Sequence, residues 1–179
     1  MKHILNTSIL LLYLGLITTS CNRDKLDDFI TTQDYGVANR MMSDAKDMVD
    51  LNFNSSAEAR LSAPACDGAT ITIENSDSFL TPDSLTIDFG NTNIWCHRKF
   101  RKGKIIAIRT APYLTQGSIT TITFEDYYVN DHQIDGEKIV TNTGLNTDGF
   151  LEFDIEAVID VHLENGNSIN WTSNRTRTW

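Results

Sequence analysis

The stretch "LEFDIEAVIDVHL", residues Leu151–Leu163, alternates apolar and polar side chains over its length, with Val158 as the exception. Apolar residues occupy every second position, and the positions between them include the acidic residues Glu152, Asp154 and Glu156. Successive side chains of a β-strand point to opposite faces of the sheet, so this pattern predicts one long strand with a dry face and a wet face. A dry face and a wet face are typical of an antiparallel sheet that packs one side on a core.

Turn signals on both sides of this strand predict its neighbours. Asn165-Gly166 is a strong signal for a hairpin turn, so a partner strand is predicted over 168–172 with a continuation toward Trp179. Upstream, short β-branched runs bounded by turn-forming residues predict further strands at 69–74, 84–89 and 104–110.

A second hairpin is predicted in the middle of the chain. Asn130-Asp131 is interpreted as the turn between strands at 118–129 and 132–142, and Gly136 as a bulge in the second of them. Alternation along the first strand places three residues on one face, namely Ile122, Phe124 and Tyr128. The total is about seven strands.

One helix is predicted before the strands, from about residue 32 to residue 50. Its apolar residues recur at helical spacing and form one face, namely Ala38, Met41, Met42, Ala45, Met48 and Val49. The fold class expected is mainly β, either an antiparallel β-sandwich or a curled sheet, preceded by one N-terminal helix. Residues 32–62 would form the helix and a linker, and residues 63–179 the antiparallel β domain.

The N-terminal residues have the features of an export signal. A short basic start precedes the apolar run of residues 9–17, which is too short for a membrane span of roughly 20 residues. Thr18-Thr-Ser20 leads to Cys21, which resembles the lipobox of bacterial lipoproteins although Thr18 replaces the usual Leu or Val. Residues 1–20 are therefore predicted as a lipoprotein signal peptide, Cys21 as the acylated residue and residues 21–31 as a solvated tether. The alternative is an ordinary cleaved signal peptide with an incidental cysteine.

The charge balance makes nucleic acid an unexpected partner. The chain has 179 residues and a formal net charge of −9, and from Cys21 onward it carries 14 basic and 24 acidic residues. Nucleic-acid binding depends on clustered Lys and Arg, which release counterions from phosphates. The densest basic stretch, Arg98–Lys104, is short and is predicted to be a solvated loop.

Two cysteines remain once Cys21 carries lipid. In an oxidising compartment an even number favours a disulfide between Cys66 and Cys96. Two free thiols are the alternative, and a third is a reactive Cys96 beside His97. The third is disfavoured because neighbours in a strand point to opposite faces.

No motif predicts a catalytic residue, a metal or a cofactor. The sequence lacks a nucleophile elbow, a zinc-protease motif and a phosphate-binding loop. The acids at 152, 154 and 156 lie in one row, whereas glycoside hydrolysis needs two carboxyl groups roughly 5 to 10 Å apart across the scissile bond. Four aromatic residues are candidates for a binding surface if they emerge on one face: Tyr127, Tyr128, Trp171 and Trp179.

Several stretches resemble an uncharacterised group of Bacteroidota-type cell-envelope lipoproteins: "LTIDFGNTNIWCHRKFRKGKIIAIRTAPY", "GSITTITFEDYYVN", "KIVTNTG" and "INWTSNRTRTW". The resemblance spans residues 66–179. It implies the pairing of Cys66 with Cys96 and a lipid anchor in the cell envelope, at the outer membrane or cell surface. Acidic residues just after Cys21 also resemble surface-export signals of such proteins. Members of the group continue past "RTRTW" into further strands, which implies that this chain is a truncated product or a fragment.

Two functions are consistent with these observations. The preferred hypothesis is a membrane-anchored envelope protein with a non-enzymatic role, binding a glycan or a protein partner or serving a structural purpose. The alternative is a hydrolase that acts on envelope or dietary polysaccharide and carries its acids on the long strand.

Overall fold

The computed structural model describes residues 23–54, 66–74 and 83–179, with the side chains of residues 33–53 in the first of these ranges. The chain divides into two compact units, Met1–Gln33 and Asp34–Trp179, and the strands described all belong to the second. The predicted signal peptide, the acylation of Cys21 and the linker after the helix fall on residues outside the described ranges.

The helix α1 comprises Arg23–Asn54. It begins within the segment 21–31, which is the predicted tether, so residues 23–31 are helical. Its apolar face agrees with the prediction: five of the six residues are buried and Met41 is partly buried. The five buried residues are Ala38, Met42, Ala45, Met48 and Val49.

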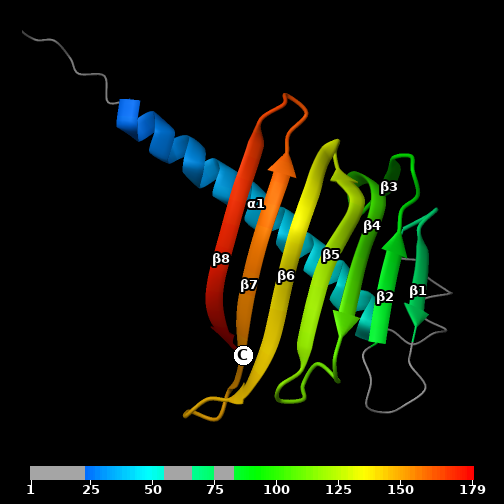
Figure 1. Cartoon of the computed structure of the whole chain (residues 1–179), viewed down its shortest axis with the longest axis vertical. Helices are drawn as coiled ribbons and strands as arrows, with labels where there is room; N and C mark the ends of the chain where they lie inside the picture. The colour runs from blue at the N-terminus through cyan, green and yellow to red at the C-terminus, as the bar shows by residue number, and fades with distance from the viewer. Residues whose placement is uncertain (1–22, 55–65, 75–82) are drawn as a thin grey trace, which may run out of the picture. The chain divides into compact units, whose positions relative to one another are not determined.

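The strands of the described residues form one open antiparallel sheet, and this confirms the predicted mainly β fold with one preceding helix. The spatial order is β1-β2-β4-β5-β6-β7-β8, and β3 pairs with β4 (Figure 1). Of the two predicted arrangements, a single sheet is the one present. The strands are β1 (Thr70–Glu74), β2 (Asp83–Asp88), β3 (Ile94–Cys96), β4 (Lys99–Arg109), β5 (Ile119–Val129), β6 (His132–Leu145), β7 (Leu151–His162) and β8 (Ser168–Thr178).

The strand β7 has the predicted dry face. Its buried residues alternate along the strand, namely Phe153, Ile155, Ala157, Ile159 and Val161. Most of them join the helix face in one core, while Phe153 and Ile155 form a smaller cluster with Val140. Full burial of one such side chain contributes roughly 1.5 to 3 kcal/mol, so the alternation in the sequence accounts for much of the packing of the sheet on α1.

The hairpin of β3 and β4 corrects the predicted solvated loop at Arg98–Lys104. His97 and Arg98 form the turn, and both have positive φ, at 47° and 64°. β4 begins at Lys99, so most of the basic stretch lies in a strand and Arg101 is completely buried. The turn contains neither Gly nor Asn, the residues that normally announce such a conformation in a sequence.

One extra residue in β5 changes which side chains face the core. The register with β6 shifts between Thr123 and Tyr128, and Asp126 has a positive φ of 45° there. Beyond this bulge the side chain of Tyr127 is fully buried, like that of Ile122. The prediction that Tyr128 shares the face of Ile122 is therefore wrong, because the bulge inverts the alternation.

Two glycines flank this bulge on the neighbouring strands. A Cβ on Gly103 of β4 would lie 1.9 Å from the carbonyl oxygen of Asp126, so only glycine fits there. A Cβ on Gly136 of β6 would lie 2.1 Å from the carbonyl oxygen of Val158. The predicted bulge at Gly136 is thus at the right level of the sheet, but the extra residue lies in β5.

A buried ion pair joins α1 to the sheet. The guanidinium of Arg101 donates to Asp44 Oδ2 at 2.6 Å, to the Tyr127 hydroxyl at 2.5 Å and to the Cys96 carbonyl at 3.3 Å. Lys99 Nζ lies 3.1 Å from the other Asp44 oxygen. Burial raises the pKa of Tyr127, so its hydroxyl stays protonated. Hydrogen bonds of this kind compensate the desolvation of Arg101.

Candidate functional site

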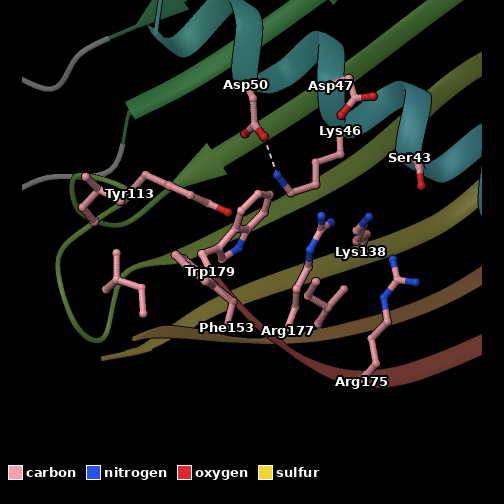
Figure 2. Close-up of a pocket in the computed structure, with 13 residues that line it drawn as sticks. Ser43, Lys46, Asp47, Asp50, Tyr113, Lys138, Phe153, Arg175, Arg177 and Trp179 are labelled. Atoms are coloured by element: carbon pink, nitrogen blue, oxygen red, sulfur yellow. Dashed lines mark hydrogen bonds and ion pairs between the residues drawn. The ribbon is translucent and has the colours of Figure 1, made fainter. Parts of the chain in front are cut away.

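A cleft of about 440 Å³ lies between α1 and the strands β6, β7 and β8. We call it the basic cleft. Figure 2 shows its charged and aromatic side chains meeting from the helix, from the β4–β5 loop and from the end of the sheet. Its lining residues are Ser43, Lys46, Asp47, Asp50, Tyr113, Leu114, Lys138, Leu151, Phe153, Ile155, Arg175, Arg177 and Trp179.

The spacing of residues along each element explains why these side chains converge. On α1, Lys46 and Asp50 are four residues apart, lie on one face and form an ion pair. On β8 and just beyond it, Arg175, Arg177 and Trp179 occupy alternate positions and so share a face. The cleft is therefore lined by residues spaced four apart on the helix and by residues spaced two apart on the strand that it faces.

Lys138 is the unusual residue of the basic cleft. Its side chain is only 2% exposed, and among the described residues it makes no hydrogen bond and no ion pair. Burial is the main cause that lowers its pKa to about 8, and the positive charges of Lys46 and Arg175 add to the effect. Asp47 and Asp50 oppose it more weakly. A charged side chain that is almost wholly buried and has no partner is costly for the protein, and its ammonium is available to an anionic ligand in the cleft.

Arg175 adds a second under-used donor. Its Nε is buried without a hydrogen-bond partner among the described residues, while Nη1 donates to Asn39 Oδ1 at 3.4 Å. Arg177 contributes a third cation, with its guanidinium carbon 4.1 Å from the ring centroid of Trp179. Four basic and two acidic side chains line the cleft, so its lining is positive in a protein of net negative charge.

Aromatic rings form the other wall. Tyr113 stacks on Phe153 with the ring centroids 4.9 Å apart and the planes 16° apart. Trp179 is 59% exposed and therefore keeps much of its surface free for contact. Lys46 Nζ lies 5.3 Å from the Tyr113 ring centroid, which joins the aromatic wall to the charged one. The cleft thus offers flat apolar surfaces beside cationic groups.

The four aromatic residues predicted as a binding surface lie in different places. Tyr127 and Trp171 are buried in the core, where Tyr127 stacks on Phe124. Tyr128 is half-buried, with Lys102 Nζ 4.1 Å from its ring centroid. Only Trp179 of the four lines the basic cleft. Tyr113 also lines the cleft and was not among the predicted residues, because nothing in the sequence distinguishes it from the other tyrosines.

The acidic residues of β7 do not line the basic cleft. Glu152, Asp154 and Glu156 alternate with the buried residues and so lie on the other face of the sheet. Asp154 accepts a hydrogen bond from the Thr176 hydroxyl at 2.8 Å, a contact across the β7–β8 pair. These carboxylates form a row along one strand and do not face a second acid across the cleft.

Cys66 and Cys96 form a disulfide with their Cα atoms 5.0 Å apart, as predicted. The side-chain nitrogen of His97 lies within 4.8 Å of both sulfur atoms, because His97 occupies the first position of the β3–β4 turn. The expectation that strand alternation would separate His97 from Cys96 is therefore wrong. Both thiols are consumed by the disulfide, which leaves neither as a nucleophile or metal ligand.

Lys138 could have been noticed in the sequence. It occupies the same alternate positions of β6 as the buried residues Ile134, Val140 and Asn142. A charged residue at a core-facing position of a strand marks either a buried ion pair or a binding site. The other residues that line the cleft come from distant elements, and no local pattern in the sequence identifies them.

The low pKa of Lys138 predicts a specific dependence of stability on pH. The folded protein binds this proton less tightly than the unfolded chain, whose lysine has the ordinary pKa of 10.5. The cost of the charge is fully present below about pH 8 and disappears as the pH rises toward 10.5. As the pH rises between these limits, the free energy of unfolding of the wild type, measured in urea, should increase by on the order of 1 to 3 kcal/mol relative to that of Lys138→Met. If the free energy of unfolding changed with pH in the same way in both proteins, the lowered pKa of Lys138 would be contradicted. The variant Lys138→Arg, which stays charged, should not become more stable over this pH range.

Comparisons with known proteins do not assign a family. No family model matches the sequence, and the curated proteins and the solved structures give no significant match either. Among the described helical residues, no stretch has both the length and the apolar character that a membrane span needs.

Proposed function

We propose that this protein is a lipid-anchored cell-envelope protein with a non-enzymatic role, and that it binds a glycan or a protein partner in the basic cleft. The observation that carries the proposal is the composition of the cleft, which combines an exposed tryptophan, a stacked aromatic pair and an unpartnered buried lysine. Binding sites for small ligands have this character, with flat apolar surfaces and a few polar groups that converge.

The positions of the acidic residues favour binding over hydrolysis. The row of carboxylates on β7 lies on the other face of the sheet from the cleft. Within the cleft, Asp50 is already held by the ammonium of Lys46 and lies 3.5 Å from Arg109. A hydrolase of the glycosidase type needs a carboxyl group that is free to transfer a proton to the leaving group, and the carboxylate of Asp50 is engaged by these two cations.

A glycan array probed with the wild type and with Trp179→Ala tests the role of the cleft. Loss of the stacking surface should lower the affinity for a bound glycan by about tenfold or more, and tenfold is equivalent to about 1.4 kcal/mol. Trp95→Ala is the matched control, because Trp95 is also 59% exposed but lies on β3, away from the cleft. Equal losses in the two variants would contradict the assignment of the cleft.

The envelope location is tested separately at Cys21. Cys21→Ser should release the protein from the membrane fraction, because a stable anchor takes more than one acyl chain and the cysteine carries them. Mass spectrometry of the wild type should show the added lipid. A Cys21→Ser protein that stays membrane-bound, together with an unmodified wild type, would contradict the anchor.

A further inference from the structure

We infer that the ligand of the basic cleft is an acidic sugar, a carboxylate carried on a pyranose-sized ring, whose carboxylate is bound by Lys138 and Arg175. This inference rests on the proposed binding function and specifies its ligand class. It is carried by two donors that lack partners among the described residues, the ammonium of the nearly buried Lys138 and the buried Nε of Arg175, and by the mixture of charged and aromatic walls around them.

The charges of the cleft require a ligand with a negative group. Lys138 is deeply buried without an ion pair, and the Nε of Arg175 is buried without an acceptor. A carboxylate has two oxygens and accepts several charge-assisted hydrogen bonds, so one carboxylate satisfies both donors. Figure 2 shows these side chains beside each other on the strand side of the cleft, facing the helix.

The net charge limits the size of that ligand. The whole chain carries a formal charge of −9, whereas the lining of the cleft has more basic than acidic residues. A long polyanion would meet repulsion over the rest of the surface, whereas a single acidic ring or the acidic end of a chain would not. A volume of about 440 Å³ also suits a ligand of one or two rings.

The helix side of the cleft favours a hydroxylated body over an alkyl one. Ser43, Asp47 and Asp50 line the helix side and offer acceptors for hydroxyl groups. Tyr113 and Trp179 offer flat surfaces for the apolar face of a sugar ring. An alkyl chain in this place would remove these charged groups from water without giving them hydrogen bonds, which is unfavourable.

The pKa of Lys138, about 8, makes the binding sensitive to pH. The groups that face it are Lys46, Asp47 and Asp50 from α1 and Arg175 from β8. Below pH 8 the ammonium is charged and binds the acid. Above pH 8 it loses its proton and the affinity for the acid falls, while the affinity for a neutral sugar stays constant.

Methyl β-glucuronide and methyl β-glucoside test the inference, since they differ only in a carboxylate against a hydroxymethyl group. Each is titrated into the full-length purified protein by NMR at about pH 7 and about pH 9.5. At the lower pH the glucuronide should bind at least about tenfold more tightly than the glucoside. At the higher pH this ratio of the two affinities should fall about tenfold. Lys138→Met should remove the preference, whereas Lys138→Arg should keep it at both pH values.

Three results would overturn the inference. Equal affinities for the two glycosides would exclude the acid, and failure of both to bind would exclude the acidic sugar class. Cyclohexanecarboxylate, an acid on a ring without hydroxyl groups, would exclude the sugar body if it bound as tightly as the glucuronide. Neutral glycans that bind in a Trp179-dependent way on the array would preserve the proposed function in each case, so the two failures can be distinguished.

Discussion

Replacing Asp44 by alanine is expected to cost about 3 kcal/mol of folding free energy. Arg101 is 0% exposed and its guanidinium lies 2.6 Å from Asp44. Removal of the carboxylate leaves a positive charge in the core, and its remaining acceptors among the described residues are neutral, namely the Tyr127 hydroxyl and the Cys96 carbonyl. Urea unfolding followed by circular dichroism measures the loss.

Two further variants separate the buried charge from the helix itself. Asp47→Ala removes the next acid of α1, which is exposed, and should change stability by no more than about 0.5 kcal/mol. The double variant Asp44→Leu with Arg101→Met replaces both charges by apolar groups and should recover much of the loss. A cost below about 1 kcal/mol for Asp44→Ala would show that the pair does not stabilise the helix on the sheet.

Ile159→Asp should unfold the protein. Ile159 is 1% exposed in the main core, and an unpaired carboxylate buried there costs several kcal/mol. That is a large part of the roughly 5 to 15 kcal/mol that stabilises an ordinary domain. Loss of cooperative thermal unfolding is the expected result. Ile155 is a poorer position for the test, because it lines the cleft with Lys138 and Arg175, which offer partners to a new carboxylate.

Val158→Asp is the matched control for Ile159→Asp. The two residues are neighbours on β7, but Val158 is 59% exposed on the opposite face. Its replacement should leave stability within about 0.5 kcal/mol of the wild type. If both variants unfolded, or neither did, the assignment of a dry and a wet face to β7 would fail.

The elements with a strong period were predictable from the sequence. The alternation of Leu151–Leu163 and the helical spacing from Ala38 to Val49 each place apolar residues on one side. Burial of that side is the dominant favourable term in folding, so the pattern leaves little choice of structure. The turn at Asn130-Asp131 was predictable as well, because both residues adopt positive φ readily, and both have it here.

The remaining features depend on contacts between distant residues. The bulge at Asp126 has no local signal, yet it decides that Tyr127 and not Tyr128 is buried. The basic stretch lies in β4, where Asp44, far away in the sequence, supplies a partner for the buried Arg101. The basic cleft combines side chains from the helix, one loop and three strands, and the sequence shows such a set only as isolated residues.

The disulfide has a consequence for how the molecule opens locally. It closes a loop with a sequence separation of 30 residues, which restricts the unfolded chain by about 3 to 4 kcal/mol in the chain-entropy model. That loop contains β1 and β2, at one end of the strand order, whereas the basic cleft lies at β6, β7 and β8 toward the other end. Reduction should therefore speed amide hydrogen exchange in β1 and β2 first and leave the amides around the cleft protected. The two ends of one continuous sheet would then open with separate free energies, and a ligand in the cleft would slow exchange only at its own end.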